Sequence, residues 1–341
     1  MRMNGLDEFG LIQHLTQRLK QHDSAQAGVR VGIGDDAAVL TESPGEDWLA
    51  TTDSMVQGVH FLPTTMSWLD IGYKCVAASI SDIAAMGGVP KHVLMSLVIP
   101  KNLSLTQLEQ MYDGIAECCT SYGCHVVGGN VATTTGPAVL TSTVLGTVPA
   151  GQALLRSQAR PGDVVFVTGS VGGSAAGLAY LMTGGILPAD EALAVCNWHQ
   201  RPRPQITAGI VLRETGASAC NDISDGLASE LNEIAKASRV RLRIERTRIP
   251  VAPEVRNFAR SKGLDPLEYA WYGGEDYQLV GTASAFAFAK ALSRLQSIGV
   301  MLTQIGRVEA GDGVVAEGAN QGLEVIEPKG YNHFTSGSAG V

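Results

Sequence analysis

The chain has 341 residues, of which 45% are hydrophobic and 17% are charged, and its formal net charge is -8. This composition suits a compact protein of two ordinary domains and argues against long disordered regions. A negative charge without a basic stripe argues against nucleic-acid binding, and no apolar run reaches membrane-spanning length.

The first half alternates helix-like and strand-like segments. Ser104 and Gln107 form a capping-box signature, which predicts the start of a helix after residue 104. Apolar spacing and turn residues predict the other boundaries. In chain order, we predict a helix at 7–20, strands at 36–40 and 48–52, a helix at 68–88 closed by a glycine pair, a strand at 92–100, a helix to about 121 and a strand at 138–148.

The stretch at 148–163 is rich in Gly, Pro and polar residues, and it predicts a domain boundary. We therefore expect an N-terminal domain at 1–150, a C-terminal domain at 151–335 and a disordered tail at 336–341. The second half is predicted as a strand at 163–169, a glycine-rich turn and helix, a helix at 203–214, a strand and helix at 220–237, a strand at 239–244 and a helix–strand–helix–strand series to about 308. Alternation in both halves favours an α/β fold.

The N-terminus and the cysteines favour a cytoplasmic protein. The first ten residues, MRMNGLDEFG, lack the apolar core of a signal peptide. The six cysteines show neither a zinc-ribbon spacing nor a disulfide framework, which favours a reducing compartment. Cys118, Cys119 and Cys124 are candidates for a metal site, but adjacent cysteines on a helix face different directions. We interpret these three as buried small side chains.

Carboxylates gather at the ends of predicted segments, beside Gly, Ser or Thr. Any one of them is explained as a turn residue or a helix cap. Asp82 fits that explanation worst, because it shares a weakly polar helix stripe with Cys75, Ser79 and Met86, with no Lys or Arg within a turn on that face. The full set is Asp35, Asp36, Asp53, Asp82, Asp222, Asp225, Glu275 and Asp276.

A metal ion would satisfy such acids. Oxygen ligands without a His or Cys cluster favour Mg²⁺ over zinc. Because Mg²⁺ takes only one or two protein carboxylates, scattered Asp residues suggest several ions shared with a polyphosphate. If residues 36–40 form a strand, Asp36 points away from its neighbour. We therefore expect Asp35 to bind metal and Asp36 to satisfy the local backbone.

Two glycine-rich turns are candidate phosphate loops. GSVGGSAAGL, at 169–178, lacks the Gly-Lys-Ser/Thr ending of a Walker A motif, so it either offers N–H groups to an anion or serves close packing. GGN, at 128–130, follows the strand-like HVV. No covalent nucleophile is predicted, since G-x-S-x-G is absent and none of the seven histidines forms a recognisable pattern. His60, in GVHF, is explained by spacing alone as a packed residue at a strand end.

Together these segments resemble the thiamine-monophosphate kinases, members of an ATP-binding superfamily that includes aminoimidazole ribonucleotide synthetase and selenophosphate synthetase. GVHF and GGEDY favour the kinase over its relatives. The resemblance covers nearly the whole chain, through GIGDDAAV, TTDSMVQGVHF, GYKCVAASISDIAAMGGVP, VVGGN, LRSQARPGD, VTGSVGGSAAGL, DISDGL, GGEDYQL and GYNHF.

The resemblance implies a two-domain fold, with an N-terminal mixed-sheet domain that pairs across a homodimer and a C-terminal α/β sandwich. It also implies ATP-dependent phosphorylation of thiamine monophosphate to thiamine diphosphate with several Mg²⁺ ions. Residue by residue, it places metal ions on Asp35, Thr51, Thr52, Asp53, Asp82, Asn130, Asp222 and Asp225, ATP on Tyr112, Gly129, Asn130, Arg156 and Ser224, and thiamine phosphate on His60, Glu275 and Tyr331.

The chain departs from the family pattern at Asn130, where many relatives carry Asp, at Ser79 in place of Asn and at Gln57 in place of Glu. The acceptor phosphate is already anionic, so direct in-line transfer needs no strong general base. Another enzyme of the superfamily is one alternative. A metal- and nucleotide-binding protein without turnover is a second, which only Asn130 favours.

Overall fold

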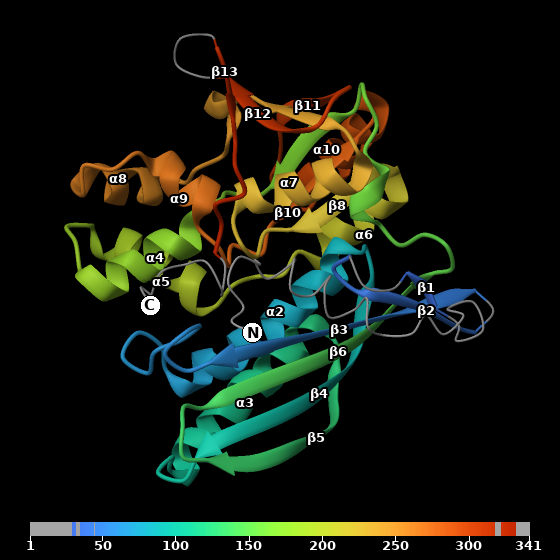
Figure 1. Cartoon of the computed structure of the whole chain (residues 1–341). Coiled ribbons are helices and arrows are strands. Elements are labelled where there is room, and N and C mark those ends of the chain that lie inside the picture. The colour runs from blue at the N-terminus through green and yellow to red at the C-terminus, as the bar shows by residue number, and fades with distance from the viewer. Residues whose placement is uncertain (1–28, 32–34, 44, 318–321, 332–341) are drawn as a thin grey trace, which may run out of the picture.

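The computed structural model describes residues 29–31, 35–43, 45–317 and 322–331. Over these ranges the chain forms two β-sheets, each packed against helices (Figure 1). None of the described helices is both long enough and apolar enough to cross a bilayer. The helix predicted at 7–20 and the tail predicted at 336–341 lie outside the described residues.

The first sheet has six strands in the described ranges, in the order β1-β2-β3-β6-β4-β5. Neighbouring strands are antiparallel except β4 and β5, which are parallel, so the predicted mixed sheet is present. Its strands are β1 (Val29–Val31), β2 (Ala38–Ser43), β3 (Glu46–Val56), β4 (Val89–Pro100), β5 (His125–Thr134) and β6 (Val139–Pro149).

Helices α2 (Trp68–Ala85) and α3 (Leu105–Tyr122) cover one face of this sheet. The capping box of Ser104 and Gln107 is present, as predicted. Two glycines let the helices approach closely. A Cβ on Gly72 would lie 2.0 Å from the Met111 carbonyl oxygen, and one on Gly114 would lie 1.8 Å from that of Leu69. Only glycine fits at these two positions.

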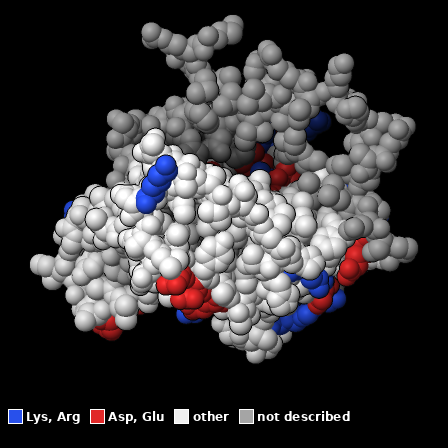
Figure 2. Space-filling view, turned by 90° about the horizontal axis from the view of Figure 1, so that it is seen from below, with Lys and Arg blue, Asp and Glu red and all other residues white. Residues whose placement is uncertain are grey.

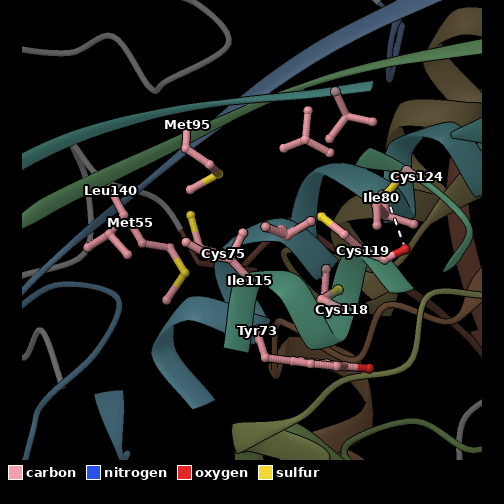
Figure 3. Packing of buried hydrophobic residues seen from close by; sticks show 14 of the residues in the cluster. Met55, Tyr73, Cys75, Ile80, Met95, Ile115, Cys118, Cys119, Cys124 and Leu140 are labelled. Atoms are coloured by element: carbon pink, nitrogen blue, oxygen red, sulfur yellow. Dashed lines mark hydrogen bonds between the residues drawn. The ribbon is translucent and has the colours of Figure 1, made fainter. Parts of the chain in front are cut away.

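The core between this sheet and the two helices contains the cysteines of the first half (Figure 3). Cys75, Cys118, Cys119 and Cys124 are all buried among apolar side chains such as Ile115. All four are free thiols. The prediction that the cysteines at 118–124 are buried small side chains is confirmed.

The second sheet has seven described strands, in the order β13-β12-β9-β11-β7-β10-β8, and helices lie on both of its faces. Helices cover both faces because side chains alternate between the two faces along each strand, and both faces are apolar. Val165 and Val167 belong to one apolar cluster, whereas Phe166 between them belongs to another. The strands are β7 (Val164–Thr168), β8 (Ala217–Asp222), β9 (Arg241–Ile244), β10 (Leu279–Ala283), β11 (Leu302–Glu309), β12 (Gly313–Glu317) and β13 (Leu323–Val325).

The helical segments of this half include three that the sequence did not predict separately. Helix α5 was missed, and α8 and α9 replace a single expected helix; strands β12 and β13 were also missed. The segments are η1 (Arg156–Gln158), α4 (Gly173–Thr183), α5 (Ala189–Gln200), α6 (Ile206–Thr215), α7 (Leu227–Ser238), η2 (Arg246–Arg248), α8 (Pro253–Ser261), α9 (Pro266–Tyr272) and α10 (Ala285–Ser297).

Helix α2 lies at the junction of the two halves (Figure 1). Its last turn, at Ala84 and Ala85, shares an apolar cluster with helix α6 of the second half. A Cβ on Gly209 of α6 would lie 2.0 Å from the Ala84 carbonyl oxygen, so the two helices are in close contact. Side chains along α2 therefore reach toward both sheets.

Candidate active site

Three carboxylates from separate parts of the chain converge at this junction. Asp36 precedes β2, Asp82 lies on α2 and Asp222 ends β8. One carboxylate oxygen from each lies within 4.8 Å of the other two. The only group of three or more potential metal ligands among the described residues is this one, which we call the acidic cluster.

The acidic cluster holds more negative charge than the nearby Arg156 guanidinium neutralises. Burial, followed by repulsion from Asp53, Asp222 and Asp36, holds the pKa of Asp82 well above its usual range. Burial and the Asp36 charge raise the pKa of Asp222 to about 8. Asp36 Oδ2 is also buried without a hydrogen-bond partner. Converging carboxylate oxygens with an unused acceptor are the donor set that Mg²⁺ prefers, so these residues fit that ion.

Hydroxyl groups orient the acids of the cluster and of strand β3. Ser81 Oγ donates to Asp222 Oδ2 at 2.6 Å, and Thr51 Oγ1 donates to Asp82 Oδ2. Asp53, on β3, accepts a 2.7 Å hydrogen bond from Ser79 Oγ. Ser79 stands where the family resemblance expected Asn, and its hydroxyl here takes part in fixing Asp53.

Asp35 and Asp36 have different partners in the structure, and Asp36 does not serve only the local backbone as we expected. Asp35 accepts hydrogen bonds from the backbone N–H groups of Asp36, at 3.1 Å, and of Arg156, at 3.3 Å. Asp36 instead belongs to the acidic cluster and forms an ion pair with the Arg156 guanidinium. The reason is local: β2 begins only at Ala38, so the two acids precede the strand and the alternation of strand side chains does not apply.

Arg156 and a buried acid, Glu230, hold the turn that follows β8. Arg156 Nε donates to Asn221 Oδ1 at 3.2 Å. Glu230 accepts from Asn221 Nδ2 at 2.5 Å, from Ser224 Oγ at 3.3 Å and from the Asp225 N–H at 3.1 Å. The sequence interpretation missed Glu230, although its spacing from Leu227, Leu231 and Ile234 places it on the buried face of α7.

A cavity of about 580 Å³ lies beside the acidic cluster and is lined by both halves of the chain. The first half contributes Thr52, Asp53 and His60 among others, and the second contributes Ser224, Asp225, Glu275 and Tyr331. The centroids of the His60 and Tyr331 rings are 6.4 Å apart. Seven residues that the sequence assigned to metal, ATP or acceptor binding therefore share one cavity.

Three predicted ATP or metal residues belong neither to the lining of this cavity nor to the acidic cluster and the residues that hydrogen-bond to it. Tyr112 is an exposed residue of α3. Gly129 and Asn130 lie inside β5 rather than in a turn after a strand, because β5 continues to Thr134. A Cβ on Gly129 would lie 1.9 Å from the Met95 carbonyl oxygen, so close packing against β4 accounts for that glycine.

The glycine-rich turn before α4 binds a carboxylate of the chain itself. The N–H groups of Gly172 and Ser174 donate to Asp276 at 2.5 and 3.0 Å. A Cβ on Gly173 would lie 2.8 Å from the Trp198 ring. Both interpretations left open by the sequence apply in part: the turn does offer N–H groups to an anion, but that anion is Asp276, and close packing requires the glycine.

Comparisons with known proteins identify the family of the chain. Residues 34–148 match the model of the AIR synthase related protein, N-terminal domain, and residues 160–318 match that of the C-terminal domain. The chain is 40% identical to the thiamine-monophosphate kinase of Bacillus subtilis (strain 168), over 96% of this chain and 100% of the relative. It is 36% identical to that of Escherichia coli (strain K12), over 96% and 98%.

A solved structure has a closely similar fold. It is described as AaThiL complexed with AMPPCP and TMP; the TM-score is 0.85 and the identity is 35%, over 98% of this chain and 99% of that one. The predicted fold class is thereby confirmed. The chain belongs to the thiamine-monophosphate kinase family and carries both domains of the AIR synthase related proteins.

Proposed function

We propose that the protein phosphorylates thiamine monophosphate to thiamine diphosphate, with ATP as the phosphoryl donor. One observation carries the proposal: residues assigned to the acceptor, His60, Glu275 and Tyr331, line the same cavity as Asp53 and Asp225, beside the acidic cluster. The similar structure named above is described as a complex with AMPPCP and TMP. A cavity lined from both halves suits a reaction between two substrates.

The proposed metal is Mg²⁺, in several sites. Asp36, Asp82 and Asp222 would hold one ion, since their oxygens converge and repel one another. When bound, Mg²⁺ neutralises the charge on the phosphate groups of ATP and the acceptor. The further ligands proposed from the family resemblance are Asp35, Thr51, Thr52, Asp53, Asn130 and Asp225.

The side chains of the chain bind, orient and neutralise the substrates. Arg156 and Ser224, both fixed by hydrogen bonds, are proposed to contact ATP together with Tyr112, Gly129 and Asn130. An acceptor phosphate oxygen attacks the γ-phosphorus; this O–P bond forms while the bond from the γ-phosphorus to the bridging β-oxygen breaks, and ADP leaves. Positioning and charge neutralisation suffice for this step, so no phosphoenzyme forms.

We also propose a homodimer that forms through the first sheet. The sheet face away from α2 and α3 carries hydroxyl and apolar residues, such as Thr52, Thr143 and Leu94, and the side of the molecule seen in Figure 2 is mainly uncharged. Val126, Val127 and Val131 are exposed on the edge strand β5. Pairing there would bury them and place Gly129 and Asn130 at the interface. Static light scattering, which measures the molar mass in solution, tests this with the wild type and Val131→Lys. The wild type should be a dimer and the variant should dimerise less. A monomeric wild type would contradict the proposal.

A coupled ADP-release assay with thiamine monophosphate, ATP and Mg²⁺ tests the activity. Turnover dependent on thiamine monophosphate is the expected result. Tight ATP binding by calorimetry without turnover would support a nucleotide-binding protein instead, the candidate that Asn130 favours. Turnover only with another acceptor would indicate a different kinase. A phosphorylated protein recovered in a rapid quench would contradict direct transfer.

We further infer a cytoplasmic location from the six free thiols.

A further inference from the structure

Lys74 is a fully buried cation that the family resemblance does not place in the site. It lies on α2 with 0% exposure. Its Nζ is 2.7 Å from Glu275 Oε2 and 3.5 Å from His199 Nδ1. An ammonium group is costly to bury without a partner, so its pairing with Glu275 accounts for its position. Lys74 comes from the first half of the chain and Glu275 from the second, so the pair joins the two halves.

Glu275 is held in an unusual position where it meets the cavity. Its φ is +66°, in the left-handed region that non-glycine residues rarely occupy. Its side chain is 27% exposed and lines the cavity. Strain of this kind persists only where neighbouring contacts fix the conformation, and it is common at ligand sites. The ion pair with Lys74 is one contact that fixes it.

The charges around Glu275 balance. Burial, with Lys74 nearby, lowers the pKa of His199 to about 3, so His199 is neutral at pH 7. Its Nδ1 also lies 3.1 Å from Ser174 Oγ. Lys74 and Glu275 therefore form a neutral pair. Its contacts with Lys74 and His199 both use Oε2, and the charge of His60 also lowers the pKa of this carboxylate. The second oxygen, Oε1, is left to accept a hydrogen bond from a ligand.

We propose that Lys74 is a positioning residue for the acceptor: it holds Oε2 of Glu275 so that Oε1 accepts a hydrogen bond from a donor group of the acceptor, such as a ring amino group. The Lys74–Glu275 pair has no net charge, so it attracts a cation only weakly, but Oε1 of Glu275 still accepts a hydrogen bond. This role rests on the proposed function. Without Lys74, Glu275 would be a partly buried carboxylate with no counter-charge and would turn away or take up a proton.

Calorimetry tests this role without requiring turnover. Thiamine monophosphate is titrated into wild type, Lys74→Met, Glu275→Gln and the double variant, with Mg²⁺ and a non-hydrolysable ATP analogue present. We expect Lys74→Met to weaken acceptor binding about tenfold or more, as losing a charge-assisted hydrogen bond does, while affinity for the ATP analogue changes by less than about twofold. In the Glu275→Gln background, Lys74→Met should change acceptor affinity by less than about twofold.

Leu242→Ala, a buried substitution on β9 away from the cavity lining, controls for lost stability and should leave acceptor affinity unchanged. If Lys74→Met does not fold, Lys74→Gln, which keeps a donor but not the charge, replaces it. The inference would be overturned if Lys74→Met weakened acceptor binding equally in the wild type and in the Glu275→Gln background. It would also be overturned if Lys74→Met left the acceptor affinity of the wild type unchanged. Wild type that binds thiamine monophosphate without turnover would refute only the proposed function; wild type that does not bind it would refute both.

Discussion

Ser81 donates a 2.6 Å hydrogen bond to Asp222, and it thereby joins helix α2 of the first half to the last residue of β8 in the second. Both residues are buried. A carboxylate at the carboxyl end of a strand is thus fixed by a hydroxyl from the other half of the chain. The acidic cluster exists only when the two halves are packed together, and its properties can be tested by substitution.

Asp82→Asn should separate metal binding from folding. We expect turnover to fall roughly 100-fold or more and the Mg²⁺ concentration required to rise, because the amide is a weaker ligand. The fold already raises the pKa of Asp82, so removing its charge should leave the free energy of unfolding without Mg²⁺ unchanged or increase it. Steady-state kinetics measure the turnover and the Mg²⁺ requirement, and urea unfolding in the presence of a chelator measures the free energy of unfolding. Asp113→Asn, an exposed position on α3, is the control; a large stability loss confined to Asp82→Asn would indicate a structural acid.

Glu230→Ala should disturb the turn that holds Ser224 and Asp225. Three donors would lose their acceptor, so we expect a loss of about 2–3 kcal/mol in stability and a rise in KM for ATP of about tenfold. Glu233→Ala on the same helix removes only a surface ion pair with Lys236 and should cost under about 0.5 kcal/mol. Similar values of KM for ATP in both variants would show that the turn does not depend on Glu230.

His199 should make the protein less stable in acid. It takes up a proton near pH 6.5 when unfolded, whereas burial and Lys74 lower its pKa to about 3 in the fold. Between these values only the unfolded chain is protonated. Stability that is fully present above pH 6.5 should therefore fall by up to about 1.4 kcal/mol per pH unit as the pH drops toward 3. Urea unfolding at several pH values measures this slope. It should be smaller in His199→Asn and unchanged in His125→Asn.

Gly114→Ala should destabilise the first domain, although alanine is the better helix former. Its Cβ would lie 1.8 Å from the Leu69 carbonyl oxygen, so α2 and α3 must separate, at a cost of about 2 kcal/mol or more. An exposed helical glycine would instead gain about 1 kcal/mol from this change. Ala116→Gly, an exposed position of α3, should cost about 1 kcal/mol. Thermal unfolding of the two variants gives the comparison, and a stabilised Gly114→Ala would show that the helices are not in tight contact.

Regular periodicity predicted the elements and acids that depend on local chain geometry. The capping box at Ser104 follows from the local sequence alone and is present in the structure. Helical spacing also singled out Asp82 as an acid in need of a partner, and Asp82 belongs to the acidic cluster. Asp36 could not be placed in this way, because the segment before β2 is irregular and its side chain is directed by Arg156, 120 residues away along the chain.

Partners distant in the sequence explain the other differences. Lys74 lies within an apolar stretch of α2, and its partner Glu275 is 201 residues further along. The turn at Gly172 has the composition of a phosphate loop, but its anion, Asp276, lies on another loop. In neither case does residue composition identify the partner, because tertiary packing determines it.

Helix α2 carries both Lys74, which contacts Glu275, and Asp82, a member of the acidic cluster. Eight residues at 1.5 Å per residue separate them by about 12 Å along the axis. Helix α2 therefore sets the spacing between Glu275, the proposed contact of the acceptor, and the acidic cluster. One residue inserted between Lys74 and Asp82 would turn the acid by about 100° around the helix and so take it out of the acidic cluster.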